Sequence, residues 1–316
     1  MAAERKNSGE TKSEAVRRFS KRRLIRRIFL WVLAVVLVVS CTSQGRQFWR
    51  RMFRLSEFGG RIDAPLSIHI LDVGKADAIL IECDGHVALV DAGTSVHGET
   101  VVDYMLRYDM EELDYAIISH PDKDHLGGME QVLSEMPVNA LVRSPYFEDQ
   151  YEAVLQTARE RSVADRIVRP TEKLPLGEAF LQVLSPLDEY EDTNNASLVI
   201  RLEYHGFSAL FCGDIEKEAE RDLVNAYGDL LSAAILKVPH HGSKTSCTKR
   251  FLQAVSPRYA VISVGEDNNN LPSEDILKRL DDYCRDVYQT DTDGTVIFAF
   301  DGTSLQIRTE HDFSIP

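Results

Sequence analysis

The stretch His120-Pro121-Asp122-Lys123-Asp124-His125-Leu126-Gly127-Gly128 gathers potential metal ligands at one point of the chain. Four side chains in this stretch can bind a divalent cation: His120, Asp122, Asp124 and His125. The apolar run Tyr115–Ser119 before them predicts a buried strand, and Leu126–Met136 predicts a helix after them. A turn at the end of a rigid strand can direct alternate side chains to a common point. The stretch therefore predicts a metal site between a strand and a helix.

An ordinary structural alternative exists for this stretch, a solvated polar loop in which Asp124 caps the following helix. A lone His120 or Asp122 would favour that alternative. Several ligand-type side chains in succession before two glycines favour a metal site instead. Imidazole and carboxylate groups together form donor sets for zinc, manganese or iron.

Outward from this stretch, strand-like and helical runs alternate along residues 66–309. The runs that predict strands are Leu66–Leu71, Ala78–Cys83, Val87–Val90, Tyr115–Ser119, Ala140–Arg143, Ala179–Leu184, Ser197–Tyr204, Ser208–Cys212, Ala234–Val238, Tyr259–Val264, Thr295–Phe300 and Ser304–Thr309. The runs that predict helices are Gly98–Tyr108, Leu126–Met136, Glu152–Arg161, Ile215–Tyr227, Thr248–Val255 and Ser273–Tyr283. Mixed strands and helices in two similar halves predict an α/β (α+β) domain, in which two sheets pack together with helices outside.

Charge divides the chain into a basic head and an acidic body. Residues 1–54 hold 14 Lys and Arg against 3 Asp and Glu, and the remaining residues hold 22 against 47. The head suits an anionic membrane face or an export signal, whereas the body repels a polyanion at long range. The five cysteines form no CxxC pair, which argues against a cysteine-ligated zinc ribbon and a disulfide-rich mini-protein.

An uncharged segment, Ile28–Gly45, follows the basic residues and contains the apolar core Ile28–Val39. Three interpretations stay open: a signal anchor, which the long basic segment favours, a cleaved signal peptide, and a lipoprotein acylated at Cys41. The excess of Lys and Arg before the segment predicts a cytoplasmic N-terminus and an extracellular body at the cell membrane. The predicted organisation is a basic cytoplasmic segment (1–27), a membrane anchor helix or signal segment (28–45), a tether (46–65) and a folded domain (66–316).

Five further segments accompany the ligand-rich stretch: LDVGKADAILIE (Leu71–Glu82), LVDAG (Leu89–Gly93), NNASLVIRLEY (Asn194–Tyr204), FCGDIEKEAE (Phe211–Glu220) and VPHHGSKTS (Val238–Ser246). Together and in this order, the segments resemble the exported hydrolase domain of ComEC-type DNA-uptake (competence) proteins and their stand-alone relatives. Those domains belong to the metallo-β-lactamase superfamily. The resemblance covers about Leu66 to Thr309, and it implies an αββα sandwich and a hydrolase with a dinuclear metal site.

The resemblance implies two divalent metal ions, zinc or manganese. His120 and Asp122 would hold the first metal, and Asp124 and His125 would hold the second. Asp214, which follows the predicted strand Ser208–Cys212, would bridge both metals.

The resemblance also places one of His240 and His241 on the second metal. His241 is the preferred ligand, with His240 facing the substrate as an acid or phosphate partner, but the reverse order stays open. Asp124 and His240 are the expected catalytic residues. Asp214 has an ordinary alternative role as the cap of the predicted helix Ile215–Tyr227. Side chains expected behind the metal ligands or beside the substrate are Asp91, Asn195, Ser243, Lys244, Asp72 and Asp77.

Departures from the family pattern bear on the metal and on function. Asp122 replaces the second His of the superfamily's HxHxDH signature, and no later His lies in a motif before Asp214. Asn195 or a water would then complete the first metal, and oxygen-rich ligation favours manganese. Lys75-Ala76 stands where the family usually has Gln-Gly. The many membrane spans of a complete DNA-uptake channel do not occur in this sequence.

Two cations that share a carboxylate lower the pKa of a bridging water and bind the attacked and leaving oxygens. This chemistry suits phosphodiesters, phosphate monoesters and acyl esters. The resemblance favours a phosphodiesterase or nuclease-type activity outside the membrane, linked to DNA uptake. The alternatives are an envelope phosphoesterase or other ester hydrolase with a small substrate, which the acidic body suits better, and a non-catalytic partner of an uptake machine.

The expected partners are the membrane, through the N-terminal segment, and a nucleic acid or other phosphoester substrate. No organic cofactor is expected. Basic residues in or beside the motifs could form a local patch that binds nucleic acid: Lys123, Lys237, Lys244, Lys249 and Arg250.

Overall fold

The computed structural model describes residues 26–36, 38, 63–265 and 270–310. The chain divides into two compact units, Met1–Arg54 and Leu55–Pro316. In the first unit, residues 26–36 are helical. Among the described residues, no helix has both the length and the apolar character needed to cross a membrane. Residues 37 and 39–45 of the predicted anchor at 28–45, and most of the predicted tether at 46–65, lie outside the described residues, so both stay predictions.

The second unit holds two β-sheets. Within its described residues, the first sheet has eight strands in the order β15-β14-β1-β2-β3-β4-β5-β6. The bounds of these strands are β1 Leu66–Ile70, β2 Ala78–Cys83, β3 His86–Ala92, β4 Leu113–Ile117, β5 Val138–Arg143, β6 Ala164–Ile167, β14 Val296–Phe300 and β15 Leu305–Thr309. The strands from β3 to β6 pair in parallel, and the pairs from β15 to β3 are antiparallel.

The second sheet repeats this division into parallel and antiparallel parts. Its strands follow the order β13-β12-β11-β10-β9-β8-β7, with parallel pairs from β13 to β10. The bounds are β7 Lys173–Leu176, β8 Ala179–Ser185, β9 Val199–Tyr204, β10 Phe207–Phe211, β11 Ile235–Lys237, β12 Tyr259–Ile262 and β13 Asp286–Gln289. Both sheets therefore have parallel strands, whose carboxyl ends are the usual place for a site in α/β folds.

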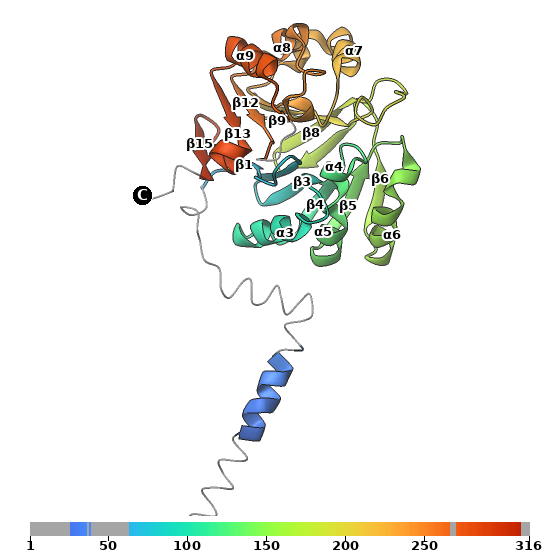
Figure 1. Cartoon of the computed structure of the whole chain (residues 1–316), viewed down its shortest axis with the longest axis vertical. Coiled ribbons are helices and arrows are strands. Elements are labelled where there is room, and N and C mark those ends of the chain that lie inside the picture. Colours follow the sequence, from blue (N-terminus) through green and yellow to red (C-terminus); the bar gives the residue numbers. More distant parts are fainter. Residues whose placement is uncertain (1–25, 37, 39–62, 266–269, 311–316) are drawn as a thin grey trace, which may run out of the picture. The chain divides into compact units, whose positions relative to one another are not determined.

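Helices cover the outer face of each sheet (Figure 1). Beside the first sheet lie α3 Gly98–Arg107, α5 Met129–Glu135 and α6 Glu152–Glu160, and beside the second lie α7 Lys217–Tyr227, α8 Lys249–Val255 and α9 Glu274–Tyr283. Shorter elements are α4 Lys123–Leu126, α10 Thr290–Asp293, η1 Glu148–Tyr151, η2 Gly228–Leu231 and η3 Pro239–Gly242. The order of layers is helices, sheet, sheet, helices, so the predicted sandwich is confirmed.

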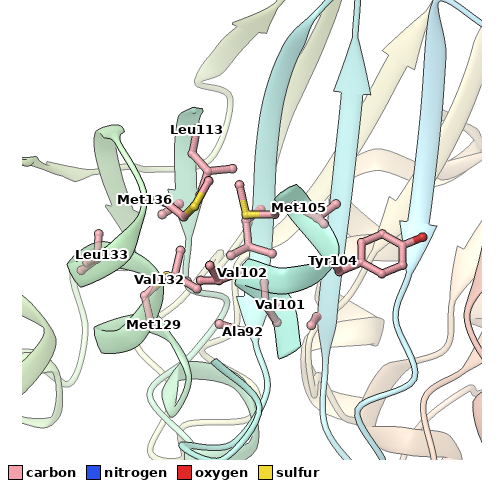
Figure 2. Close-up of a cluster of buried hydrophobic side chains, with 14 of the residues drawn as sticks. Ala92, Val101, Val102, Tyr104, Met105, Leu113, Met129, Val132, Leu133 and Met136 are labelled. Atoms are coloured by element: carbon pink, nitrogen blue, oxygen red, sulfur yellow. The ribbon is translucent and has the colours of Figure 1, made fainter. Parts of the chain in front are cut away.

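Alternation along the strands explains the layers. In β2, Leu80 packs in the cluster beneath the helices, whereas Ile79 and Ile81 pack in the cluster between the two sheets. Successive strand side chains point to opposite faces, so a strand buried on both faces must be apolar throughout. Figure 2 shows Val102 of α3 and Val132 of α5 in the helix-side cluster. Burial of each such aliphatic side chain stabilises the folded state by roughly 1.5–3 kcal/mol.

The helix predicted at Leu126–Met136 is two helices, α4 and α5, because Gly127 and Gly128 separate them. A Cβ on Gly128 would lie 2.1 Å from the carbonyl oxygen of Ala92, and one on Gly127 would lie 2.4 Å from that of Lys123. Backbone packs against backbone here, which keeps the ligand-rich turn against β3.

Three strands were not predicted: β6, β7 and β13. Each is the last strand at one edge of a sheet in the order of the described strands. Their sequences ADRI, KLPL and DVYQ carry polar residues or a proline, as edge strands commonly do. The apolar pattern that predicts interior strands is therefore too weak to find them.

Candidate metal centre

The turn after β4 brings two imidazole rings together. Both His120 and His125 are fully buried, and their ring centroids lie 4.1 Å apart. Asp124 is in the first turn of α4 and its side chain is 21% exposed, whereas Asp122 precedes that helix and its side chain is 40% exposed. The side chain of Asp122 makes no capping hydrogen bond to α4. The stretch is thus a buried pair of rings with two carboxylates on its outer side.

Asp214 reaches the same point from the second sheet, just beyond β10. Its Oδ1 lies 3.2 Å from Nε2 of His125, and its Oδ2 lies 4.0 Å from Nε2 of His120. Its backbone N–H donates to the hydroxyl of Ser197. Glu216, not Asp214, is the residue before α7, so the alternative of a helix cap does not hold for Asp214.

His241 approaches from η3, after β11, and is fully buried. Its Nδ1 lies 2.8 Å from the carbonyl oxygen of Ser263, so Nδ1 carries the proton and Nε2 is left to accept. That Nε2 lies 3.6 Å from Oδ2 of Asp124 and 3.7 Å from Oδ2 of Asp214. The geometry favours His241 as the metal ligand of the pair.

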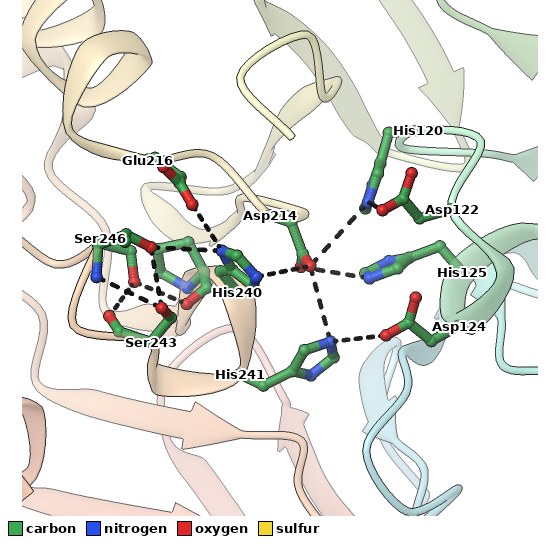
Figure 3. Close-up of polar contacts among 12 residues, drawn as sticks. His120, Asp122, Asp124, His125, Asp214, Glu216, His240, His241, Ser243 and Ser246 are labelled. Carbon is green, nitrogen blue, oxygen red and sulfur yellow. Dashed lines mark hydrogen bonds and ion pairs between the residues drawn. The ribbon is translucent and has the colours of Figure 1, made fainter. Parts of the chain in front are cut away.

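His240 has a different environment. Its side chain is 23% exposed, its Nδ1 lies 3.2 Å from Oε1 of Glu216, and its Nε2 lies 3.9 Å from Oδ2 of Asp214. Figure 3 shows Asp214 at the centre, with His240 and His241 reaching it from their own loop. Both histidines have positive φ, 50° for His240 and 52° for His241, a conformation that costs energy and is concentrated at functional sites.

Asp91, at the end of β3, holds the ligand turn in place. It accepts hydrogen bonds from the backbone N–H of Ser119 at 2.8 Å, the Ser119 hydroxyl at 2.7 Å and Nδ1 of His125 at 2.8 Å. Because Nδ1 of His125 donates to this carboxylate, its Nε2 faces Asp214. A carboxylate behind a histidine is the usual support for a metal ligand.

Within the part of the chain that the structure describes, four buried atoms at this point have no hydrogen-bond partner: Nε2 of His120, His125 and His241, and Oδ1 of Asp214. Leaving a buried polar atom unpaired costs about 1–3 kcal/mol. Among the described residues, three groups that share His125 could each hold a cation: His120, His125 and Asp214; Asp124, His125 and His241; and Asp77, Asp91 and His125. The first two contain the four atoms. The donor set therefore fits divalent metals with imidazole and carboxylate ligands.

The charges of the cluster shift the pKa values of its members in different directions. Burial acts to raise the pKa of Asp214, but the neighbouring His125 and His241 outweigh it and hold the pKa well below its usual range. Burial and the nearby His125 lower the pKa of His120 to about 4, which leaves that ring neutral at physiological pH. Burial acts to lower the pKa of His125, but Asp214 and Asp91 outweigh it and raise the pKa well above its usual range, so this ring would lose a proton when a metal binds.

A buried ion pair lies behind the cluster. Nζ of Lys237 is 2.8 Å from Oδ2 of Asp77, and both side chains are only 1% exposed. Oδ1 of Asp77 lies 3.7 Å from Nδ1 of His241. The prediction that Lys237 belongs to a basic surface patch is therefore wrong, because its charge is used inside the protein. Lys123, Lys244, Lys249 and Arg250 of that patch are exposed.

Two contacts of the proposed metal ligands could not be predicted from the sequence. Nζ of Lys75 lies 2.7 Å from Oδ2 of Asp124, and the hydroxyl of Thr193 donates to Oδ1 of Asp122 at 2.8 Å. Lys75 stood out in the sequence only as a departure from the family pattern. Thr193, beside Asn194-Asn195, had no signal of its own, because its contact joins loops 71 positions apart.

The other residues that were predicted to lie behind the metal ligands or beside the substrate are Asn195, Asp72, Ser243 and Lys244. The side-chain oxygen of Asn195 accepts from the N–H groups of Glu216 and Ala219, so this residue holds the loop after Asp214. Asp72 is exposed and accepts from the N–H of Gly74. The Ser243 hydroxyl bonds that of Thr245, and Lys244 is exposed. Their roles beside a substrate stay predictions.

Comparison with known proteins places this architecture in a family. The family described as "Metallo-beta-lactamase superfamily" matches residues 71–266. The chain is 31% identical over 255 residues to ComE operon protein 3 of Bacillus subtilis (strain 168), covering 74% of this chain and 33% of that protein. It is 30% identical over 282 residues to competence protein ComA of Neisseria gonorrhoeae, covering 86% and 38%. The chain thus spans about a third of the length of these curated relatives.

A solved structure agrees on the fold. CmlA, a diiron beta-hydroxylase from Streptomyces venezuelae, aligns with a TM-score of 0.50 at 10% identity, covering 76% of this chain and 55% of that one. Identity this low supports the fold alone. With the competence-protein relatives and the match over residues 71–266, the predicted resemblance is confirmed, and the chain belongs to the metallo-beta-lactamase superfamily.

Proposed function

We propose that the chain is a phosphodiesterase of nuclease type that uses two divalent cations, zinc or manganese. The observation that carries the proposal is the convergence of buried ligand atoms that have no hydrogen-bond partner among the described residues: those of His120 and His125 follow the first sheet, and those of Asp214 and His241 follow the second. When bound, a pair of cations supplies an activated water and binds the oxygens of a phosphate group.

The residues divide this work between them. His120 and Asp122 would hold one cation, Asp124, His125 and His241 the other, and Asp214 lies where it would reach both. Asp91 keeps Nε2 of His125 directed at the cluster.

His240 is the side chain best placed to act as a general acid or to bind a phosphate oxygen of the substrate. Its ring is partly exposed, and Glu216 at 3.2 Å fixes its orientation with Nε2 toward Asp214. From there Nε2 can donate a proton to a leaving oxygen or a hydrogen bond to a phosphate oxygen. A general acid or base in such a position contributes about 10²–10⁴-fold to a rate.

The proposed substrate class and location rest on the relatives and on the charge of the chain. The relatives named competence protein ComA and recombination protein 2, the latter from Haemophilus influenzae, favour a nucleic acid as the substrate. The basic segment before Ile28 favours a place at the outer side of the membrane. The exposed residues Lys123, Lys244, Lys249 and Arg250 supply positive charge near the site. The acidic body favours the second candidate, hydrolysis of a small phosphoester or another ester in the cell envelope.

The test uses the purified full chain with added Mn²⁺ or Zn²⁺, on linear DNA and on bis(p-nitrophenyl) phosphate. Asp124→Asn removes a proposed metal ligand, and Asp149→Asn, at an exposed position, is the matched control. Metal-dependent cleavage of DNA that Asp124→Asn abolishes and Asp149→Asn keeps would support the nuclease. Cleavage of the small diester alone would favour the envelope phosphoesterase. Metal binding without cleavage of either would sink the phosphodiesterase and leave an ester hydrolase or a non-catalytic partner.

A further inference from the structure

Lys75 directs its ammonium group at the candidate metal centre. It lies in the turn between β1 and β2, and its Nζ is 2.7 Å from Oδ2 of Asp124. The two side chains are 32% and 21% exposed. The pair therefore lies at the outer side of the centre, where a cation from solvent would arrive.

The oxygen that Lys75 contacts is the one that faces the second group of ligands. Oδ2 of Asp124 also lies 3.6 Å from Nε2 of His241, and these residues form a candidate cation group together with His125. A metal bound by this group would need the same carboxylate that the ammonium neutralises. One positive charge must then weaken the binding of the other.

The turn that carries Lys75 is fixed to the same region. The backbone N–H of Asp77 donates to the carbonyl oxygen of Asp124 at 3.1 Å, and the N–H of Ala76 donates to that of Gly74 at 2.8 Å. Backbone packs closely on the other side, since a Cβ on Gly265 would lie 2.8 Å from Cα of Gly74. The ammonium is thus tethered beside Asp124, which gives it a high effective concentration against a dissolved metal.

We propose that Lys75 is a built-in cation that competes with the second divalent metal for Asp124. The second metal binds only as the ammonium leaves the carboxylate, so its affinity is lower than the ligand set alone would give. This inference rests on the proposed two-metal site, but not on the proposed substrate.

The test is a calorimetric titration of the metal-free full chain with Mn²⁺ and, separately, with Zn²⁺. The variants are Lys75→Gln and Lys75→Met, which remove the charge, and Lys75→Arg, which keeps it. Lys123→Gln is the matched control, because Lys123 is an exposed cation beside Asp124 in the same turn. Thermal unfolding of each variant without metal checks that the fold is intact.

The expected result is a Kd for the second metal about fivefold lower in Lys75→Gln and Lys75→Met, equivalent to ~1 kcal/mol. Lys75→Arg and Lys123→Gln should bind like the unaltered chain. A second metal that binds only after Lys75 is neutralised would support the proposal equally.

Unchanged or weaker binding of the second metal in both neutral variants would overturn the proposal. Equal tightening in Lys123→Gln would do the same, because the effect would then come from general charge. Absence of a second metal from every variant would overturn both this inference and the two-metal site. Two bound metals without phosphodiester cleavage would leave the inference standing and refute only the proposed activity.

Discussion

Oδ1 of Asp214 lies 3.2 Å from Nε2 of His125, and neither of these buried atoms makes a hydrogen bond to the described residues. One residue follows β10 of the second sheet, and the other follows β4 of the first. Asp214→Asn should therefore abolish binding of at least one metal, because it removes the charge of the carboxylate that is proposed to reach both metals. Metal content after dialysis measures this. Asp229→Asn, at an exposed position in η2, is the control, and retention of both metals by Asp214→Asn would contradict the bridging role.

The adjacent histidines should separate in their effects. His241→Ala should lose a metal, since Nε2 of His241 lies 3.6 Å from Asp124. His240→Ala should keep the metals but lower turnover by about 10²–10⁴-fold, as for a lost general acid. Metal content and turnover measured on both variants test the assignment. The opposite pattern would make His240 the ligand.

Asp91→Asn should weaken metal binding or activity by about 10–100-fold, the usual cost of losing a carboxylate behind a metal ligand. The reason is that the hydrogen bond to Nδ1 of His125 holds the ring in orientation. Metal titration against a competing chelator measures the change. If Asp91→Asn bound metal as tightly as the unaltered chain, its contacts with Ser119 and His125 would be purely structural.

Lys237→Met should lower the free energy of unfolding by about 3–5 kcal/mol, because it leaves the buried carboxylate of Asp77 unpaired. Urea unfolding of the metal-free chain measures this. Lys278→Met breaks an exposed pair with Glu274 and should have a much smaller effect. An equal loss of unfolding free energy in both variants would contradict the prediction, because the buried pair would then stabilise the fold no more than the exposed pair.

Gly213→Ala should displace Asp214 and weaken metal binding. Gly213 has a φ of +53°, and a Cβ there would lie 2.9 Å from the Ser197 hydroxyl that accepts from Asp214. Gly206→Ala is the matched control, with a φ of +82° and open space around it. Backbone strain should cost each variant about 1 kcal/mol of stability, but only Gly213→Ala should lose metal.

The interior of the fold could be predicted from sequence because its strands are apolar on both faces. The ligand-rich turn and Asp214 could be placed because they follow such strands directly. The edge strands β6, β7 and β13 could not, since their polar side chains and position at a sheet edge weaken the pattern.

Contacts between the two sheets also could not be predicted from the sequence. Lys237 and Asp77 lie 160 positions apart, and nothing in either segment shows that they meet. A lysine beside a histidine motif predicts a surface charge by default, and burial of Lys237 depends on the packing of one sheet on the other. The contact between Lys75 and Asp124 depends on tertiary packing in the same way.

The origin of the ligands in both sheets has a consequence for folding. A chain in which the sheets have not yet packed together cannot offer His125 and Asp214 to the same ion, so the unfolded state would bind metal poorly. A ligand that binds only the folded state stabilises it by mass action, by about 2.7 kcal/mol at a free concentration a hundred times its Kd. The supply of metal to the compartment would then set how long the protein survives heat and proteases, as well as how fast it acts.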